Sequence, residues 1–252
     1  MHSRERPCTP SFLSRRTAIG QGHWPCIVPR FGGYRLVMKV IEVFADVSCP
    51  FAHVGLRRLV AQRDTLGADL VLRVRAWPLE LVNGHPMDAA LIAEEVDEIR
   101  AQVAPDLFAG FVESAFPHTS MPAFALAAAA YGAGDQVGER VSLALRDALF
   151  EHGRDVSDPT VIEAIGQAHG VVLHPAATAG EAVSRAVQSD WHEGQQRGVQ
   201  GSPHFFTPDG AFFCPTLDIR RVDGRLRITA DNDAFDGFVD QCLRTDGATP
   251  HE

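Results

Sequence analysis

The sequence predicts an α/β protein with a large all-helical insertion, and three observations support this fold class. Residues 40–45 (VIEVFA) and 70–77 (LVLRVRAW) have the alternating, β-branched character of strands, and a helical segment separates them. About a hundred residues of helical periodicity follow, which is far longer than an ordinary crossover. Aromatic runs on either side of residues 207–210 (TPDG) then predict a β-hairpin.

The first two strands and the helix between them form a β-α-β unit. Pro50 suits the first turn of this helix, because the N–H that proline lacks is not needed there, and Gly67 predicts the end of the helix. Pro78 ends the second strand. A right-handed crossover makes the two strands parallel.

The helical insertion contains several segments with clear apolar periodicity. We expect helices within residues 88–103, 121–134, 139–153, 157–170 and 174–198. After the hairpin, residues 226–229 predict a short strand and residues 232–245 a closing helix. The expected organisation is a first domain made of residues 38–85 and 198–245, with a helical subdomain, residues 86–197, inserted into it.

Composition excludes several classes of partner. The chain has 252 residues and a net charge of −9, which argues against binding to a nucleic-acid backbone. It has no apolar run long enough for a membrane span. Its five cysteines neither pair up as a secreted framework nor form a zinc-binding cluster, so we expect no metal and a cytoplasmic protein.

Residues 1–37 differ from the rest of the chain. They show no helical or strand periodicity and carry six arginines against one glutamate. Arg15-Arg16 is reminiscent of a twin-arginine signal, but the region after it is a poor apolar core. We expect a poorly structured extension, with Met38 as an alternative start of translation.

Residues 46–56 (DVSCPFAHVGL) place Cys49 at the turn between the first strand and the first helix. A thiol at a helix N-terminus is expected to have a lowered pKa, because the unsatisfied N–H groups favour the thiolate. His53 lies one turn further on, and two interpretations stay open: it tunes the thiolate or binds substrate, or it is a surface or packing residue. Ala52 occupies the place where a C-x-x-C motif has its second cysteine. Asp46 is expected to hydrogen-bond the backbone of the turn, with a proton relay as the alternative.

Three motifs carry a resemblance to a known family: residues 44–56 (FADVSCPFAHVGL), 74–84 (VRAWPLELVNG) and 198–206 (GVQGSPHFF). Together they resemble the DsbA-like branch of the thioredoxin superfamily, in particular its FrnE-type and 2-hydroxychromene-2-carboxylate isomerase-like members, over about residues 40–245. The resemblance implies a thioredoxin-like fold with a helical insertion and a cis Ser202–Pro203 bond. It also implies catalytic roles for Cys49 and His53, and substrate binding by Pro50, Phe51, Ser202 and Pro203.

The departure at Ala52 leaves three functions open. The first is a monothiol oxidoreductase in which glutathione or mycothiol, as a co-substrate, replaces the missing cysteine. The second is a thiol-dependent isomerase or transferase that acts on a small aromatic substrate, and the third is a non-catalytic binding domain.

Cys214 is the last candidate site residue. In the predicted hairpin Cys214 lies opposite Pro203, which makes it a candidate resolving thiol, although a structural role is favoured. We expect no tightly bound cofactor. The expected partners are a small thiol and a small-molecule or protein disulfide, and a homodimer is a candidate assembly.

Overall fold

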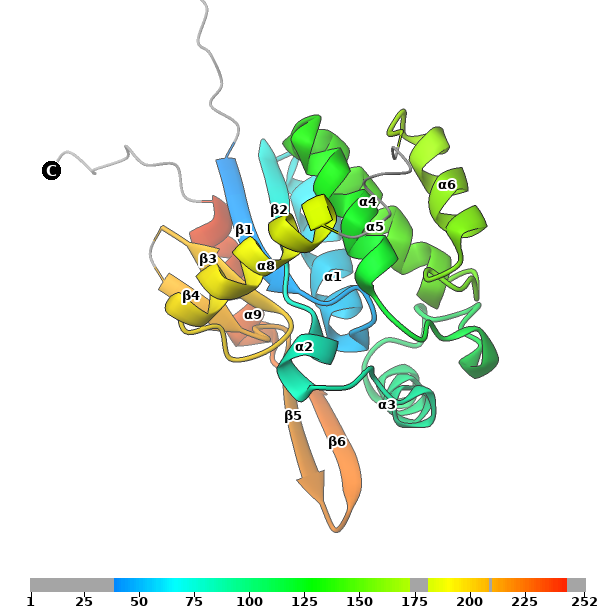
Figure 1. The fold of residues 1–252 in the computed structure, drawn as a ribbon. Helices are drawn as coiled ribbons and strands as arrows, with labels where there is room; N and C mark the ends of the chain where they lie inside the picture. Colours follow the sequence, from blue (N-terminus) through cyan, green and yellow to red (C-terminus); the bar gives the residue numbers. More distant parts are fainter. Residues whose placement is uncertain (1–38, 173–180, 209, 244–252) are drawn as a thin grey trace, which may run out of the picture. The chain divides into compact units, whose positions relative to one another are not determined.

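The computed structural model describes residues 39–172, 181–208 and 210–243. The expectations for residues 1–37 lie outside this part of the chain. A four-stranded sheet with strand order β2-β1-β3-β4 forms the centre of the fold (Figure 1). Its strands are β1 (Lys39–Ala45), β2 (Leu70–Ala76), β3 (His204–Thr207) and β4 (Gly210–Phe213).

The strand pairing confirms the predicted β-α-β unit and the predicted β-hairpin. β1 and β2 are parallel, while β3 is antiparallel to β1 and to β4. The hairpin of β3 and β4 has the predicted register, with Phe205 opposite Phe212 and Phe206 opposite Ala211. The backbone N–H of Cys214 donates to the carbonyl of Pro203 over 3.0 Å, so the predicted pairing extends one residue beyond the strands.

Helix α1 (Pro50–Leu66) connects β1 to β2 and begins and ends where the sequence predicts. Cys49 is its N-cap residue, and Pro50 occupies the first helical position. Gly67 has a φ of 61°, the left-handed conformation in which glycine commonly ends a helix. The first turn of α1 therefore starts directly at the candidate nucleophile.

The predicted helical insertion lies between β2 and β3. The long helices lie within or overlap the predicted segments, except that residues 174–180 of the segment predicted at 174–198 lie outside the described residues. The short elements α2 and the 3-10 turn η1 were not predicted from the periodicity. The elements are α2 (Leu79–Asn83), α3 (Ala89–Gln102), η1 (Glu113–Ala115), α4 (Met121–Gly132), α5 (Asp135–Phe150), α6 (Pro159–Ala168) and α8 (Glu181–Gln196). None of the helices in the described ranges combines the length and apolarity needed to cross a membrane.

Side chains from the insertion cover the open edge of β2. The N–H of Leu72 donates to Glu139 over 2.5 Å, that of Val74 to the Tyr131 hydroxyl over 2.8 Å, and that of Ala76 to Asp190 over 2.9 Å. These three partners come from α5, α4 and α8 respectively. The insertion thus removes an edge that would otherwise be available for pairing with another chain.

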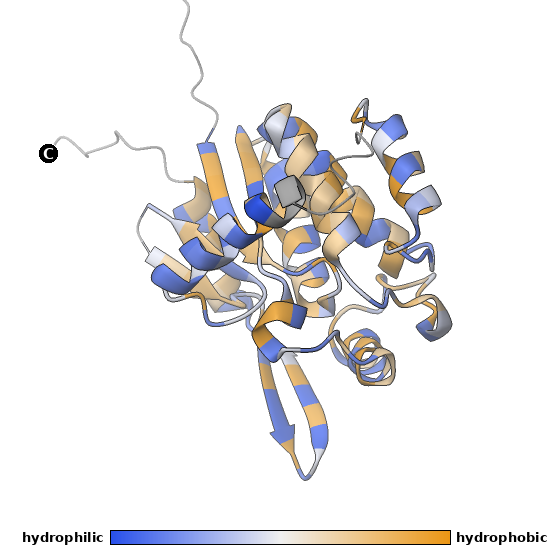
Figure 2. Cartoon of the chain, viewed as in Figure 1, coloured by the Kyte–Doolittle hydropathy of each residue, from blue (hydrophilic) through white to orange (hydrophobic). Residues whose placement is uncertain are grey.

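Buried apolar residues pack the helices against the sheet, and Figure 2 shows where the apolar residues lie along the ribbon. The small-residue helix α4 buries Ala123, Leu126 and Ala130, as its composition predicts. A second apolar cluster joins the sheet to the closing helix α9 (Asn232–Leu243) and includes Phe205, Phe238 and Cys242.

A second, two-stranded sheet precedes α9. It consists of β5 (Leu217–Val222) and β6 (Arg225–Ala230), whereas the sequence analysis predicted a single short strand at residues 226–229. The turn between the strands is Asp223-Gly224, with φ values of 52° and 78°. An Asp-Gly turn with two positive φ angles is a typical two-residue hairpin connection, and this signal identifies the missed strand.

Candidate active site at the Cys49 turn

Two hydrogen bonds join the Cys49 turn to the loop before β3. The Cys49 thiol donates to the carbonyl of Ser202 over 3.2 Å. The Ser202 hydroxyl in turn accepts the backbone N–H of Asp46 over 2.9 Å. The Ser202–Pro203 peptide bond is cis in the structure, as the sequence analysis expected. Segments more than 150 residues apart in the sequence therefore form one site.

The carboxylate of Asp46 holds the turn in place by accepting hydrogen bonds from its backbone and side chains. Its fully buried carboxylate accepts the N–H of Ser48 over 2.8 Å, the hydroxyl of Ser48 over 2.7 Å and the N–H of Leu79 over 2.6 Å. These contacts match the interpretation that Asp46 bonds the backbone of the turn. Burial raises the pKa of Asp46, and the hydrogen bonds act in the opposite direction.

The pKa of Cys49 differs from the sequence-based expectation. Burial raises the pKa of this thiol to about 12, and the negative charges of Glu95 and Asp46 act in the same direction. The side chain of Cys49 is only 4% exposed, so loss of hydration outweighs the effect of the helix N-terminus. The expectation of a lowered pKa is therefore wrong for this conformation.

His53 has partners other than Cys49. It is 1% exposed, lies against the rings of Phe108 and Phe150, and shares a 2.6 Å hydrogen bond between its Nε2 and Glu151. Burial lowers the pKa of His53, and a neutral ring with its proton on Nε2 can donate to the carboxylate. These contacts favour a structural role that ties α1 to the end of α5.

Glu151 receives further donors in the same region. The backbone N–H groups of Phe108 and Ala109 donate to its carboxylate over 2.9 and 3.2 Å. Burial alone would raise the pKa of Glu151, but the hydrogen bonds from His53 and from the backbone lower it to about 2.

The remaining predicted residues lie around the turn. Pro50 is buried and Phe51 is half-buried at the start of α1. Cys214 is buried next to Pro203 with a φ of 44°, and burial raises the pKa of its thiol to about 11. Within the described part of the chain, Cys49, Cys214 and Cys242 are all free and buried.

Two charged residues that interact with the turn were not predicted from the sequence. Arg146 on α5 is fully buried, and its guanidinium donates to the carbonyl of Asp46 over 3.0 Å and to the Ser142 carbonyl and hydroxyl over 2.9 and 2.7 Å. It also lies close enough to Cys49 for an electrostatic interaction. Its position four residues after Ser142 on a largely apolar helix face is the only sequence signal for this role.

Glu95 on α3 is the second of these residues. Burial, assisted by the charge of Glu94, raises the pKa of Glu95 to about 7, although the charge of Arg221 opposes the shift. A group with this pKa titrates at neutral pH. Arg146 and Glu95 thus both act electrostatically on Cys49, and the charge of Glu95 depends on pH.

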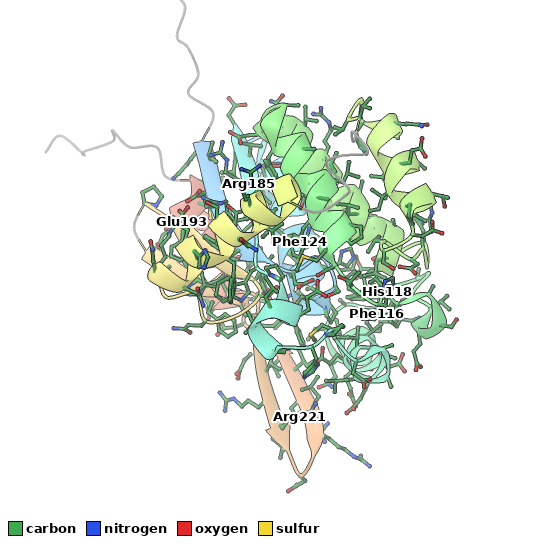
Figure 3. The ribbon with its side chains drawn as sticks, in the orientation of Figure 1. Phe116, His118, Phe124, Arg185, Glu193 and Arg221 are labelled. Carbon is green, nitrogen blue, oxygen red and sulfur yellow. The ribbon has the colours of Figure 1, made fainter. Side chains whose placement is uncertain are left out.

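A small cavity borders the Cys49 turn at Ser48. The cavity next to Ser48 has a volume of about 10 Å³, which is about the volume that one water molecule requires. Thr119 and Ser120 hydrogen-bond the Glu80 carboxylate over 2.9 and 3.3 Å at its rim. Phe116 lies on the same segment, between α3 and α4 (Figure 3). These contacts join the segment to α2 beside the Cys49 turn.

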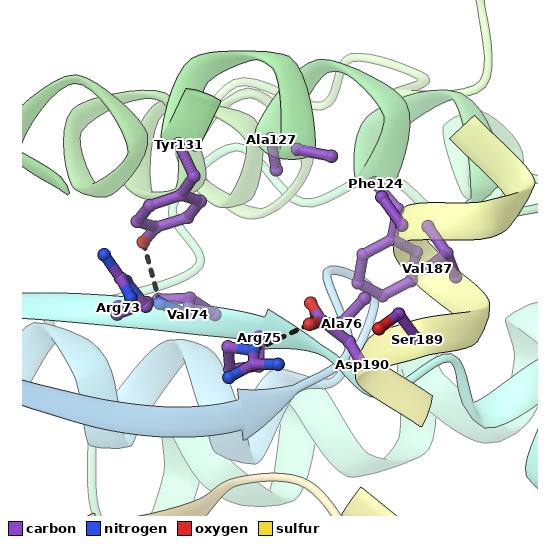
Figure 4. A pocket seen from close by; sticks show the side chains of 12 residues that line it. Arg73, Val74, Arg75, Ala76, Phe124, Ala127, Tyr131, Val187, Ser189 and Asp190 are labelled. Carbon is purple, nitrogen blue, oxygen red and sulfur yellow. Dashed lines mark hydrogen bonds and ion pairs between the residues drawn. The ribbon is translucent and has the colours of Figure 1, made fainter. Parts of the chain in front are cut away.

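A larger cavity of about 460 Å³ lies between β2, α4 and α8 (Figure 4). Phe124, Tyr131 and Val187 supply much of its lining, and Arg75 with Asp190 form an ion pair at its wall. Cys49 is not among its lining residues. Among the described residues there is no group of three His, Cys, Asp or Glu side chains that could hold a metal ion.

We expect Glu151→Gln to reduce the stability of the fold in a pH-dependent way. The folded pKa of about 2 is below the ordinary value of 4.5, so the ionised carboxylate stabilises the fold above pH 4.5 and loses this effect as the pH falls towards 2. Thermal melts should show a lower Tm for the variant at pH 7 and a smaller decrease between pH 4.5 and pH 2. Glu163→Gln, at an exposed position on α6, is the control. Equal pH profiles for the native protein and Glu151→Gln would contradict this assignment.

Glu95→Gln should make Cys49 more reactive above pH 7. The substitution removes a negative charge that raises the pKa of the thiol, and Glu95 carries this charge only above its own pKa of about 7. Peptide mapping of iodoacetamide-treated protein should show faster alkylation of Cys49 at pH 8 to 9 and no change at pH 6. Asp97→Asn, an exposed neighbour on α3, should have no effect. An unchanged rate at pH 9 would show that Glu95 does not act on Cys49.

Comparison with known proteins agrees with this geometry. The model of the DSBA-like thioredoxin domain family matches residues 40–227. No curated protein matches the sequence. The chain is similar in structure to a 2-hydroxychromene-2-carboxylate isomerase, with a TM-score of 0.55, 15% identity and coverage of 69% of this chain and 88% of the other.

Two further solved structures share the fold. One is the cytosolic disulfide reductase DsbM from Pseudomonas aeruginosa with GSH, with a TM-score of 0.51, 17% identity and coverage of 82% and 100% of the two chains. The other is a probable DsbA oxidoreductase from Streptomyces coelicolor, with a TM-score of 0.51, 19% identity and coverage of 84% and 92%. On the family match and the thioredoxin-like arrangement around Cys49, the chain belongs to the family of DSBA-like thioredoxin domains.

Proposed function

We propose that the protein is a thiol-disulfide oxidoreductase that acts through Cys49 alone, with a small external thiol in place of a second active-site cysteine. The observation that carries this proposal is the hydrogen bond of 3.2 Å between the Cys49 thiol and Ser202, at the N-terminus of α1. Ala52 holds the position one helical turn away where a second thiol would close a disulfide. Pro50, Phe51 and Pro203 surround the same point and would contact the substrate.

The reaction has two exchange steps. The Cys49 thiolate attacks one sulfur of a substrate disulfide, so that a mixed disulfide forms on Cys49 and the other substrate sulfur leaves as a thiolate. A small thiolate, from glutathione or mycothiol, then attacks the mixed disulfide and releases Cys49. A second small thiol completes the reduction, so the two electrons come from the small thiols, which end as their own disulfide.

Burial of Cys49 constrains the first step. A pKa of about 12 leaves roughly one side chain in 10⁵ as thiolate at pH 7. Entry of water or substrate would remove part of this desolvation and leave the helix N-terminus and Arg146 to favour the thiolate. We infer that the contacts of Thr119 and Ser120 with Glu80 open before Cys49 reacts.

A second candidate is a thiol-dependent isomerase or transferase for a small aromatic substrate. The structural neighbour named as a 2-hydroxychromene-2-carboxylate isomerase and the absence of a second thiol in the turn favour it. In this case Cys49 would activate a bound small thiol without net oxidation or reduction. A non-catalytic binding domain is the third candidate, and the closed, high-pKa thiol favours it.

We also propose a substrate class, supporting residues and a cellular location for this activity. The substrate is a small-molecule or protein disulfide, and His53 serves the reaction by holding α1 in place. Cys214, next to Pro203, is the candidate resolving thiol if one is used. A cytoplasmic location suits an enzyme that draws on a reducing thiol pool, and the neighbour DsbM is named as cytosolic. A homodimer stays a candidate assembly.

Cys49→Ser should reduce disulfide turnover to the uncatalysed rate, because serine does not form a mixed disulfide. The assay is the reduction of a small disulfide, run separately with glutathione and with mycothiol. Cys242→Ser, which removes a buried thiol from α9, is the matched control and should keep the activity. Full activity of Cys49→Ser would exclude the redox proposal. Isomerase activity in both the native protein and Cys49→Ser, without redox turnover, would favour the second candidate.

A further inference from the structure

The hairpin of β5 and β6 has one strongly cationic face. Residues directly opposite each other in an antiparallel pair share a face, and Arg220 lies opposite Arg227 while Val222 lies opposite Arg225. Arg220, Arg225 and Arg227 are all exposed, and the Arg220 side chain is 73% accessible. The other face carries Leu226 and Ile228, which are buried. Figure 2 shows the alternation of polar and apolar residues along this hairpin.

This arrangement of charges costs stability. Like charges directly opposite each other in a β-sheet repel, as Arg220 and Arg227 do here. Arg220 has one acidic neighbour, Asp218, at 2.8 Å, whereas Arg225 and Arg227 have no ion-pair partner within the described residues. The hairpin, residues 217–230, has four arginines against two aspartates, a formal charge of +2 on a chain of −9. This face belongs to an acidic protein, and among the described residues only Arg220 of its three arginines has an acidic partner, which indicates an anionic ligand.

The hairpin starts beside the candidate active site. The N–H of Leu217, the first residue of β5, donates to the carbonyl of Cys214 over 3.3 Å, and the N–H of Cys214 donates to Pro203 over 3.0 Å. Pro203 follows Ser202, whose carbonyl accepts the Cys49 thiol. From this base the two strands extend past α2 and α3 (Figure 1), and Arg221 lies along them (Figure 3).

The apolar face fixes the hairpin against α3. The side-chain amide of Gln102 donates to the carbonyl of Leu226 over 3.2 Å and accepts the N–H of Ile228 over 3.0 Å. The apolar face of the hairpin is therefore covered, because Leu226 and Ile228 are buried, and the arginine face is exposed. The three guanidinium groups are thus presented by a supported strand pair, which lowers the entropy lost when a ligand binds.

We propose that the face formed by Arg220, Arg225 and Arg227 docks an acidic, extended segment of the protein whose disulfide reacts at Cys49. This proposal rests on the oxidoreductase function proposed above. Arg225 and Arg227 are two residues apart on one strand, about 7 Å, which is also the spacing of alternate side chains in an extended peptide. Carboxylates on alternate residues of the segment would therefore meet successive arginines.

The geometry also sets where the segment lies in the substrate. Arg220 and Arg227 are about 10 Å along the hairpin from its base, because each residue adds about 3.4 Å. An extended substrate covers this distance with three to four residues. Because Ser202, Pro203 and Cys214 lie between this base and Cys49, the acidic segment begins no closer to the reacting cysteine than about that many residues.

An acidic protein segment fits the surface better than a nucleic acid does. Val222 is the only large apolar side chain on the arginine face, so the face offers no aromatic platform on which bases could stack. The net charge of −9 on the chain would also repel a phosphate backbone beyond the hairpin.

The test uses a fluorescent peptide with an alkylated cysteine, a three-residue Gly/Ser spacer and three glutamates on alternate positions. Binding to the full chain is measured by fluorescence anisotropy. We expect R220Q/R225Q/R227Q to weaken binding about tenfold or more, as three exposed ion pairs would. The matched control R140Q/R154Q/R185Q removes three exposed arginines elsewhere and should change Kd by less than about threefold. Binding to the native protein should also weaken with added salt.

Three results would overturn the proposal: equal loss in both triple variants, equal binding of a peptide with glutamine in place of glutamate, or tighter binding of a single-stranded oligonucleotide at the same arginines. Turnover of a small disulfide separates this proposal from the function on which it rests. The R220Q/R225Q/R227Q variant should reduce a small disulfide at the native rate and lose activity only on the acidic peptide disulfide. Peptide binding through the arginines in a protein without any disulfide turnover would uphold the surface and reject the oxidoreductase function.

Discussion

The buried carboxylate of Asp46 is the interaction on which the candidate site depends. It accepts two hydrogen bonds from Ser48 and one from the N–H of Leu79, so it fixes the end of β1, the Cys49 turn and the start of α2 together. An unsatisfied buried donor costs about 1–3 kcal/mol, and two backbone N–H groups here have Asp46 as their acceptor. The carbonyl of Asp46 also accepts a hydrogen bond from the fully buried guanidinium of Arg146. The position of Cys49 thus follows from a polar network and not only from apolar packing.

The same network explains why the thiol is well placed but has a raised pKa in this conformation. Ser202 holds the sulfur through its carbonyl and holds the backbone of Asp46 through its hydroxyl. Close packing around these bonds excludes water, and the desolvation raises the pKa of the thiol far more than the helix end lowers it. In such a site the closed fold positions the thiol without activating it. We infer that water reaches the thiol, and lowers its pKa, when the contacts of Thr119 and Ser120 with Glu80 open.

Local patterns in the sequence predicted most of the fold. Alternating β-branched residues, Pro50 and Gly67 gave the β-α-β unit, and the Thr207–Gly210 turn gave the register that places Cys214 beside Pro203. The β5 strand was missed because its arginines interrupt the apolar alternation, although the Asp223-Gly224 turn marked it. Arg146, Glu95 and the contacts of His53 could not be predicted, because they depend on which helix faces meet in the folded insertion. The high pKa of Cys49 has the same origin, since its burial depends on elements distant in the sequence.

The central claim is that Cys49, although buried, is the cysteine that forms a mixed disulfide with a small thiol. Mass spectrometry of the native protein after incubation with oxidised glutathione, followed by peptide mapping, tests it most directly. We expect one glutathione on Cys49, which is released by added thiol, and no adduct on the buried Cys242 under the same conditions. An unmodified Cys49 after prolonged incubation, in a protein that carries glutathione at other cysteines, would contradict it.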